Sequence, residues 1–179
     1  MEGWCRLAPH TQRPGENSMA AKLKTDPAVI AALNDVLTAE LTAINQYFIH
    51  AKMCGDWGYE RLHAAIRHES IDEMKHAEEI IERILYLGGI PNLQKLGKVN
   101  VGETVLEQFE LDLALENLAI PRLQKAIDLC TEKGDHGTRL LFERILAGEE
   151  EHVDWLEAQM ELISQVGIEN YLGQQLGNA

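Results

Sequence analysis

The chain of 179 residues is 45% hydrophobic and 25% charged, a composition typical of one soluble globular domain. Its 16 Lys and Arg against 29 Asp and Glu leave a formal net charge of −13. This balance argues against nucleic-acid binding and against a polybasic membrane contact, because both need clustered cations. It fits either a solvated acidic surface or carboxylates that bind metal ions, and composition alone does not choose between them.

The N-terminal segment shows no helical periodicity, so we expect residues 1–24 to be a disordered extension of a domain over residues 25–179. The segment lacks the apolar run of a signal peptide, and Met19 is a second candidate start because the patterned sequence begins just after it. No later stretch approaches the ~18 uncharged apolar residues of a membrane helix. The three distant cysteines favour a reducing, cytoplasmic location rather than a disulfide framework or a metal knuckle; they are Cys5, Cys54 and Cys130.

The first predicted helix begins at Asp26-Pro27, where Asp is a favoured N-cap and proline a favoured first helical residue. Apolar residues then recur every three or four positions and predict one buried stripe that ends near Gly55. They are Leu33, Leu37, Leu41, Ile44 and Phe48. A second helix is predicted over roughly residues 57–87, where Gly88-Gly89 ends it. Its stripe consists of Leu62, Ile66, Ile80, Ile84 and Leu87.

A connection without helical periodicity spans residues 88–104. Thr104 followed by Glu107 then predicts a capping box at the start of a third helix, which runs toward Gly134. Pro121 lies inside this helix and is expected to kink it or end it early. A fourth helix is predicted over roughly residues 138–166, and an amphipathic tail over 168–176 predicts a short fifth helix.

The four main helices are of similar length, about 45 Å each. Short links join the first helix to the second and the third to the fourth, so each pair forms an antiparallel hairpin. The link between the two pairs is long enough to run the length of a bundle. We therefore predict an all-α, ferritin-like antiparallel four-helix bundle with a long crossover between helices 2 and 3 and a short C-terminal fifth helix.

Each of the four long helices carries one glutamate on its apolar stripe near its middle, and the second and fourth helices add a histidine three residues later. These side chains are Glu40, Glu73, His76, Glu116, Glu149 and His152. Any one of them alone is more simply explained as a core residue satisfied by a neighbour. Four buried carboxylates without counter-charge, however, are unfavourable by several kcal/mol each, and no basic residue falls on the same stripes at these heights.

Two divalent cations would balance the four carboxylates, and two Glu-x-x-His pairs with two single glutamates match the ligand pattern of di-iron bundles. Hard carboxylate oxygens with imidazoles favour iron or manganese over metals that prefer thiolates. Excess carboxylate stabilises the oxidised metal and so favours oxidation of Fe(II) by dioxygen or hydrogen peroxide. Tyr47 lies seven residues after Glu40 on the same stripe, and we interpret it first as a packed core tyrosine. Hydrogen bonding to a ligand, or donation of an electron, is the other interpretation.

Several segments resemble bacterioferritins, and the resemblance extends from about residue 23 to the C-terminus. These segments are Glu40-Leu-Thr-Ala-Ile-Asn-Gln-Tyr-Phe, His68-Glu-Ser-Ile-Asp-Glu-Met-Lys-His-Ala, Leu87-Gly-Gly-Ile-Pro-Asn-Leu, Asp112-Leu-Ala-Leu-Glu116 and Glu149-Glu-Glu-His-Val-Asp-Trp-Leu-Glu. The resemblance implies a hollow shell of two dozen subunits that oxidises Fe(II) and stores the product as a ferric mineral. It also implies that the six inward residues named above form a dinuclear ferroxidase centre.

Further sites follow only from this resemblance. Helical geometry alone places Met74 off the core face, whereas the resemblance makes it an axial ligand of haem b, paired with its twin across a subunit two-fold. His68 and Asp72, four residues apart, indicate a solvated helix face by spacing alone. The resemblance implies that they bind iron on the inner cavity wall. A bacterioferritin-associated ferredoxin is the implied protein partner.

The leading hypothesis is an iron-storage protein with ferroxidase activity, in which Glu73 and Glu149 bridge the metals and Glu40 and Glu116 are terminal ligands. A di-iron peroxidase that resembles rubrerythrins and stores no mineral is the alternative, but those proteins usually carry a separate CxxC-type iron domain. A DNA-shielding mini-ferritin is a non-enzymatic alternative. Its iron site lies between subunits, so one chain would not contain two Glu-x-x-His pairs.

Overall fold

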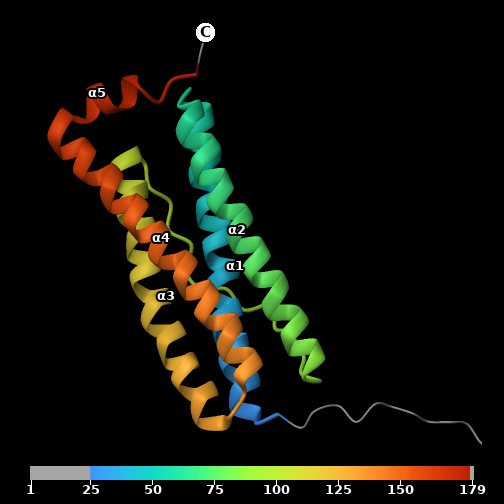
Figure 1. Ribbon diagram of the computed structural model, residues 1–179. Coiled ribbons are helices and arrows are strands. Elements are labelled where there is room, and N and C mark those ends of the chain that lie inside the picture. Colours follow the sequence, from blue (N-terminus) through green and yellow to red (C-terminus); the bar gives the residue numbers. More distant parts are fainter. Residues whose placement is uncertain (1–24, 178–179) are drawn as a thin grey trace, which may run out of the picture.

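The computed structural model describes residues 25–177, and within that range it contains five α-helices and no strand (Figure 1). The helices are α1 (Pro27–Asp56), α2 (Glu60–Tyr86), α3 (Val105–Lys133), α4 (His136–Val166) and α5 (Ile168–Gly173). The predicted all-α, ferritin-like fold class is thereby confirmed. The expected extension over residues 1–24, which includes Met19 and Cys5, lies outside the described residues.

The bundle consists of two antiparallel hairpins, α1 with α2 and α3 with α4 (Figure 1). A crossover from the end of α2 returns the chain to the opposite end of the bundle, where α3 begins (Figure 1). Each hairpin packs closely on itself, whereas the two hairpins meet mainly where α1 lies against α3. A site built from all four long helices therefore depends on how the hairpins are placed against each other.

The helix ends follow the capping residues of the sequence. Asp26 accepts a hydrogen bond from the Ala28 amide at 2.9 Å, and Thr104 accepts one from the Glu107 amide at 3.2 Å. α1 continues through Gly55 to Asp56, and α2 begins only at Glu60, so the predicted start of α2 near residue 57 is too early. Gly58, with φ of 84°, makes the turn between these two helices because a left-handed conformation suits a residue without a Cβ.

Two expectations about the later helices need correction. α3 does not end early at Pro121 but continues to Lys133. Pro121 lies on the exposed side of α3, so water can satisfy the carbonyl that loses its helical hydrogen bond. α5 ends at Gly173, earlier than the predicted residue 176, and buries Tyr171 against the bundle.

Phe48 was expected on the buried stripe of α1, and this was wrong: it is 43% exposed, whereas the adjacent Tyr47 is fully buried. Successive helical residues point about 100° apart, so only one of the two can face the core. The Phe48 ring instead lies near two cations, 5.8 Å from Lys52 Nζ and 5.6 Å from Arg67 Cζ. The buried face of α1 therefore runs through Ala43, Tyr47 and Ala51.

Among the described helices, α1 is the one long and apolar enough to cross a membrane by length and composition, contrary to the expectation that no stretch approaches a membrane helix. Within the bundle 44% of its most apolar window is buried. Its buried face also carries Glu40, Gln46 and His50. We therefore interpret α1 as a core helix of the bundle.

The core has two apolar clusters separated by a charged layer. One cluster contains Leu33, Ile80 and Phe142, and the other contains Tyr47, Phe109 and Leu156. The buried glutamates of the four long helices fall between the two clusters along every helix. Close packing on both sides keeps the positions of these glutamates fixed.

Candidate metal centre

The structure brings all six predicted ligands together in the charged layer of the core. α1 contributes Glu40, α2 contributes Glu73 and His76, α3 contributes Glu116, and α4 contributes Glu149 and His152. The four glutamates are only 2–3% exposed, and the His76 side chain, at 22%, is the most exposed of the six. Each hairpin thus supplies two carboxylates and one imidazole.

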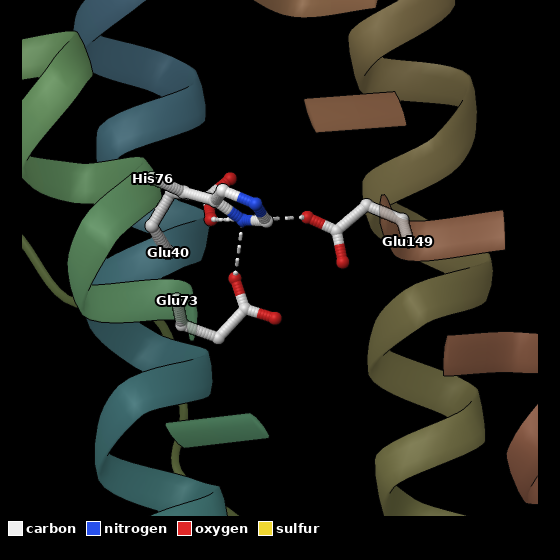
Figure 2. A group of neighbouring side chains, drawn as sticks. All are labelled: Glu40, Glu73, His76 and Glu149. Atoms are coloured by element: carbon white, nitrogen blue, oxygen red, sulfur yellow. Dashed lines mark hydrogen bonds and ion pairs between the residues drawn. The ribbon is translucent and has the colours of Figure 1, made fainter. Parts of the chain in front are cut away.

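The ligand atoms fall into two groups, in each of which they lie within 4.8 Å of one another. The first group is Glu40, Glu73, His76 and Glu149, drawn in Figure 2, and the second is Glu73, Glu116 and His152. Glu73 belongs to both groups, the position required of a bridging carboxylate. Glu149, the other predicted bridge, belongs to the first group only.

The two histidines hold the carboxylates in different ways. Figure 2 shows the His76 ring surrounded by three of them: its Nδ1 lies 3.2 Å from Glu73 Oε2, 3.4 Å from Glu40 Oε2 and 3.6 Å from Glu149 Oε1. His152 Nδ1 lies 2.8 Å from Glu116 Oε1. His76 therefore joins the two hairpins, whereas His152 pairs with a carboxylate of its own hairpin.

Burial and mutual repulsion raise the proton affinity of most of the glutamates. Burial raises the pKa of Glu149 to about 9, and the charge of Glu73 adds to this. Burial, and then the charge of Glu40, raise the pKa of Glu73 well above its ordinary value. Although burial alone would lower the pKa of His76, the nearby carboxylates of Glu149, Glu40 and Glu73 raise it to about 12. Without a metal, the centre holds protons in place of cations.

Glu116 behaves differently. Burial would raise its pKa, but the hydrogen bond and charge of His152, with a hydrogen bond from Tyr47, lower it overall. The Glu116–His152 pair is therefore charged, while the carboxylates around His76 compete for protons. This asymmetry makes the two halves of the centre chemically distinct.

The donor set fits two hard divalent cations. One carboxylate oxygen, Glu40 Oε2, is buried without a hydrogen-bond partner. Within residues 25–177, no Lys or Arg side chain forms an ion pair with any of the four glutamates. Oxygen-rich sites with imidazole suit iron or manganese, and a positive ion would supply the missing counter-charge.

Two aromatic residues complete the wall of the centre. Tyr47 is fully buried, as the first interpretation requires, and its hydroxyl also donates a hydrogen bond to Glu116, as the other interpretation expected of a ligand. Trp155 stacks on the His152 ring with centroids 6.1 Å apart. Trp155 was not among the predicted site residues, although its position three residues after His152 on the same helix could have indicated the contact.

A cavity of about 300 Å³ between α2 and α4 leads to the centre. It is lined by four of the ligands, Glu73, His76, Glu149 and His152, and by His68, Glu69, Asp72, Gly148, Glu151 and Trp155. His68 Nε2 lies 3.3 Å from Asp72 Oδ2, and the His68 side chain is 67% exposed. The pair therefore stands at the open side of the cavity rather than in the centre itself. Asp72 also accepts a hydrogen bond from Lys75 at 2.5 Å.

Met74 lies outside the centre. It is 44% exposed on α2, which agrees with the expectation that it points away from the core. An exposed, unbranched thioether on a helix surface is available to a group outside this chain.

Three buried polar residues next to the centre were missed. Gln46, His50 and Asp112 are at most 1% exposed, and the first two, on α1, each bond to Asp112 on α3. A signal was present in the sequence, since Gln46 and His50 are four residues apart and Asp112 precedes Glu116 by four. The apolar stripes could not indicate that these residues on different helices bond across the bundle.

Comparison with known proteins agrees with this geometry. The family model of the ferritin-like domain matches residues 30–166. A bacterioferritin of Mycolicibacterium paratuberculosis is 52% identical over 152 residues, which cover 85% of this chain and 96% of that protein. Bacterioferritin BfrA of Mycobacterium tuberculosis is 51% identical over the same shares, and a bacterioferritin of Streptomyces coelicolor is 49% identical over 84% of this chain and 90% of its own length.

Proposed function

The chain belongs to the bacterioferritin family, and from this membership and its buried ligand cluster we propose that it is an iron-storage protein that oxidises Fe(II) at a di-iron ferroxidase centre within each subunit. The oxidised iron is deposited as a ferric mineral inside a homo-oligomeric shell of two dozen subunits. The observation that carries the proposal is the meeting of six side chains able to bind metal, three from each hairpin, with no Lys or Arg of residues 25–177 paired to the four glutamates.

The proposed roles follow the geometry of the two ligand groups. Glu40 and His76 hold one iron, and Glu116 and His152 hold the other. Glu73 and Glu149 bridge the two, and for Glu73 the support is strongest because its carboxylate lies in both groups. The bridging carboxylates have raised pKa values, so binding of Fe(II) displaces protons from them.

Iron is the substrate of this reaction. Each Fe(II) gives up one electron, and dioxygen takes up four electrons and four protons to become two waters, so four Fe(II) ions are oxidised per dioxygen. With hydrogen peroxide as the oxidant, two Fe(II) ions and two protons suffice. The four carboxylates stabilise the more highly charged Fe(III) product more strongly than Fe(II), and this difference favours oxidation.

The cavity between α2 and α4 supplies a path for iron. His68 and Asp72 at its open side form an iron site on the inner wall of the shell, through which ions pass between the centre and the mineral. Support comes from the cavity itself, which contains this pair together with four of the proposed ligands. The chain has a formal net charge of −13, and this negative charge attracts Fe(II) toward the protein.

The haem proposal rests on Met74 and on family membership. The exposed Met74 thioether supplies one axial ligand to a haem b shared with the same residue of a second subunit. Haem supplies a redox centre through which electrons reach the stored iron, and a bacterioferritin-associated ferredoxin is the proposed electron donor. The proposed location is the cytoplasm, where the free Cys54 and Cys130 stay reduced.

Anaerobic titration of the iron-free protein with Fe(II), followed by addition of air and measurement of ferric absorbance, tests the function. We expect two Fe(II) per subunit to bind tightly and to be oxidised rapidly. Glu40→Ala and Glu149→Gln should slow oxidation at least about 100-fold, because each removes a direct ligand. Glu150→Gln, an exposed neighbour on α4, is the matched control and should oxidise iron like the parent.

Equal rates for Glu40→Ala, Glu149→Gln and the parent would refute the proposed centre. Gel filtration tests the shell independently. A protein that elutes only as a monomer or dimer would contradict mineral storage in a shell even if the centre oxidises iron.

A further inference from the structure

A buried polar cluster beside the metal centre joins the two hairpins. His50 Nδ1 lies 2.9 Å from Asp112 Oδ1 and 3.0 Å from Asp112 Oδ2. Gln46 Nε2 donates to Asp112 Oδ1 at 2.8 Å and to the Leu111 carbonyl at 3.1 Å. Gln46 and His50 belong to α1, and Asp112 belongs to α3. We call these three residues the polar clamp.

The hydrogen atoms of the clamp are fixed by its partners. The Gly102 amide donates to His50 Nε2 at 3.0 Å, so this nitrogen is an acceptor and carries no proton. Nδ1 must then carry the imidazole proton and donates it to the Asp112 carboxylate. Gln46 is fixed in the same way, because its Oε1 accepts from the Asn100 amide at 3.0 Å while its Nε2 donates to Asp112. Every bond of the clamp thus has a single direction.

The clamp also holds the crossover against α1. The Gly102 and Asn100 amides bond to His50 and Gln46, and the Gly97 amide donates to Thr42 Oγ1 at 2.8 Å. The crossover runs from the end of α2 to the start of α3, so these three bonds to α1 connect all three helices. Asp112 then attaches the N-terminal part of α3 to α1 and the crossover.

The position of the clamp relates it to the ligands. Asp112 lies four residues, about 6 Å along the helix axis, before Glu116, and Gln46 is adjacent to Tyr47, which bonds to Glu116. A slide of α3 along α1 by much less than one turn would break all three bonds of Asp112, because hydrogen bonds tolerate changes of only a few tenths of an ångström. The clamp therefore fixes the register of α3 at the height of the metal centre.

The metal centre needs such an element. Its ligands are divided equally between the hairpins, so the distances among them depend on how the hairpins are placed against each other. A shift of one hairpin against the other would change these distances, and ligand positions must be held to about 0.5 Å for a well-formed site.

We propose that Gln46, His50 and Asp112 are positioning residues that set the α1–α3 register and so hold the two halves of the ligand set at metal-binding distance in the metal-free protein. This inference rests on the proposed function. The clamp touches no metal ligand; it acts through the placement of Glu116 on α3 relative to Glu40 on α1. Loss of the clamp lowers metal affinity beyond any general loss of stability.

Two substitutions of His50 separate the two bonds of its ring. His50→Asn keeps an amide where Nδ1 stood and can still donate to Asp112, but it loses the Gly102 bond. His50→Gln places its amide oxygen near the Nε2 position and can still accept from Gly102, but it loses the Asp112 bond. The inference requires His50→Asn to bind metal like the parent and His50→Gln and Asp112→Asn to bind it at least about 10-fold more weakly.

The probe is cobalt(II), added anaerobically to the full-length metal-free protein and followed by its visible absorption spectrum. The parent should bind two Co(II) per chain in one tight step, and the impaired variants should bind one tightly and one weakly with an altered spectrum. Arg83→Gln is the matched control, since Arg83 joins the hairpins at the far end of the bundle through Asp135 at 2.6 Å and Thr138 at 2.9 Å. It should lower the melting temperature without changing Co(II) binding.

Parent-like Co(II) binding by both His50→Gln and Asp112→Asn would overturn the inference, as would an equal loss of affinity in Arg83→Gln. If the His50 and Asp112 variants do not fold, Gln46→Met, which removes one bond to Asp112 and keeps the side-chain length, is judged by the same criteria. A parent protein that binds no Co(II) pair would instead refute the proposed function, so the two failures are distinguishable.

Discussion

Tyr47 on α1 donates a hydrogen bond to the carboxylate of Glu116 on α3, so one proposed ligand is held by a residue of the other hairpin. Burial, with the charge of Glu116, raises the pKa of Tyr47 well above its ordinary value, which keeps the hydroxyl protonated and able to donate. Together with His152, this bond keeps Glu116 ionised in the core.

Tyr47→Phe removes the hydroxyl and leaves the ring in place. We expect the free energy of unfolding of the metal-free protein to fall by about 1–3 kcal/mol, because Glu116 loses a buried donor. Urea denaturation followed by circular dichroism measures this loss. Tyr171→Phe is the control, since it also removes a hydroxyl that bonds within the bundle, to Gln159 at 2.9 Å. Only the Tyr47 variant should alter the Co(II) spectrum, and a change in both would contradict a specific role.

The stability of the metal-free protein should fall as pH rises from about 6 to 9. The pKa of Glu149 is raised from 4.5 to about 9 in the folded protein, so its contribution to stability is complete below pH 4.5 and is lost as pH rises toward 9. His76, with its pKa raised from 6.5 to about 12, acts in the same direction between those values. Groups with lowered pKa values, such as Glu116, change the stability only at acidic pH, so they do not alter the expected loss of stability between pH 6 and 9.

Glu149→Gln, which cannot ionise, should flatten this dependence and raise the melting temperature of the metal-free protein at pH 8. An increase of 1–2 kcal/mol would correspond to roughly 2–8 °C for a chain of this size. Thermal denaturation at several pH values, with Glu150→Gln as the exposed control, measures the effect. A melting temperature that stays constant or rises with pH in the parent would contradict the prediction.

Met74→Leu should abolish tight haem binding, because leucine fills a similar volume but offers no sulfur ligand. Protein purified under haem-replete conditions should show a Soret band in the parent and none in the variant, while Fe(II) oxidation and assembly remain unchanged. Met160→Leu, a partly buried methionine on α4, is the control and should keep the band. A Soret band that survives Met74→Leu would refute the assignment.

Gly102→Ala should destabilise the bundle by about 1–3 kcal/mol. A Cβ at this position would lie 2.6 Å from the Gln108 backbone nitrogen, so the crossover or α3 must shift. Because Gly102 also donates to His50, the shift strains the polar clamp. Gly173→Ala, where a Cβ meets nothing within 4 Å, should leave the melting temperature almost unchanged in the same thermal scan.

Local periodicity was sufficient for much of the fold and for the burial of the six proposed ligands. The Asp26 and Thr104 caps mark their helix starts as predicted, because capping depends on residues within one turn. Glu40, Glu73 and Glu116 are buried as their spacing on the stripes predicted. The predictions were wrong where a local sequence pattern was compatible with two structures. The stripe of α1 could continue through Tyr47 or Phe48, and Pro121 could end α3 or lie on its solvated side.

The sequence by itself determined most of the residues that face the core of each helix, since a residue's direction on a helix depends only on its position along that helix. It therefore determined that six metal-binding side chains share buried faces. Only the tertiary structure decided that Glu73 stands in both ligand groups, that Tyr47 bonds to Glu116, and that Asp112 meets Gln46 and His50. These contacts join different helices. Their formation depends on the rotation and register of packed helices, which the packing of the whole core sets and no single helix encodes.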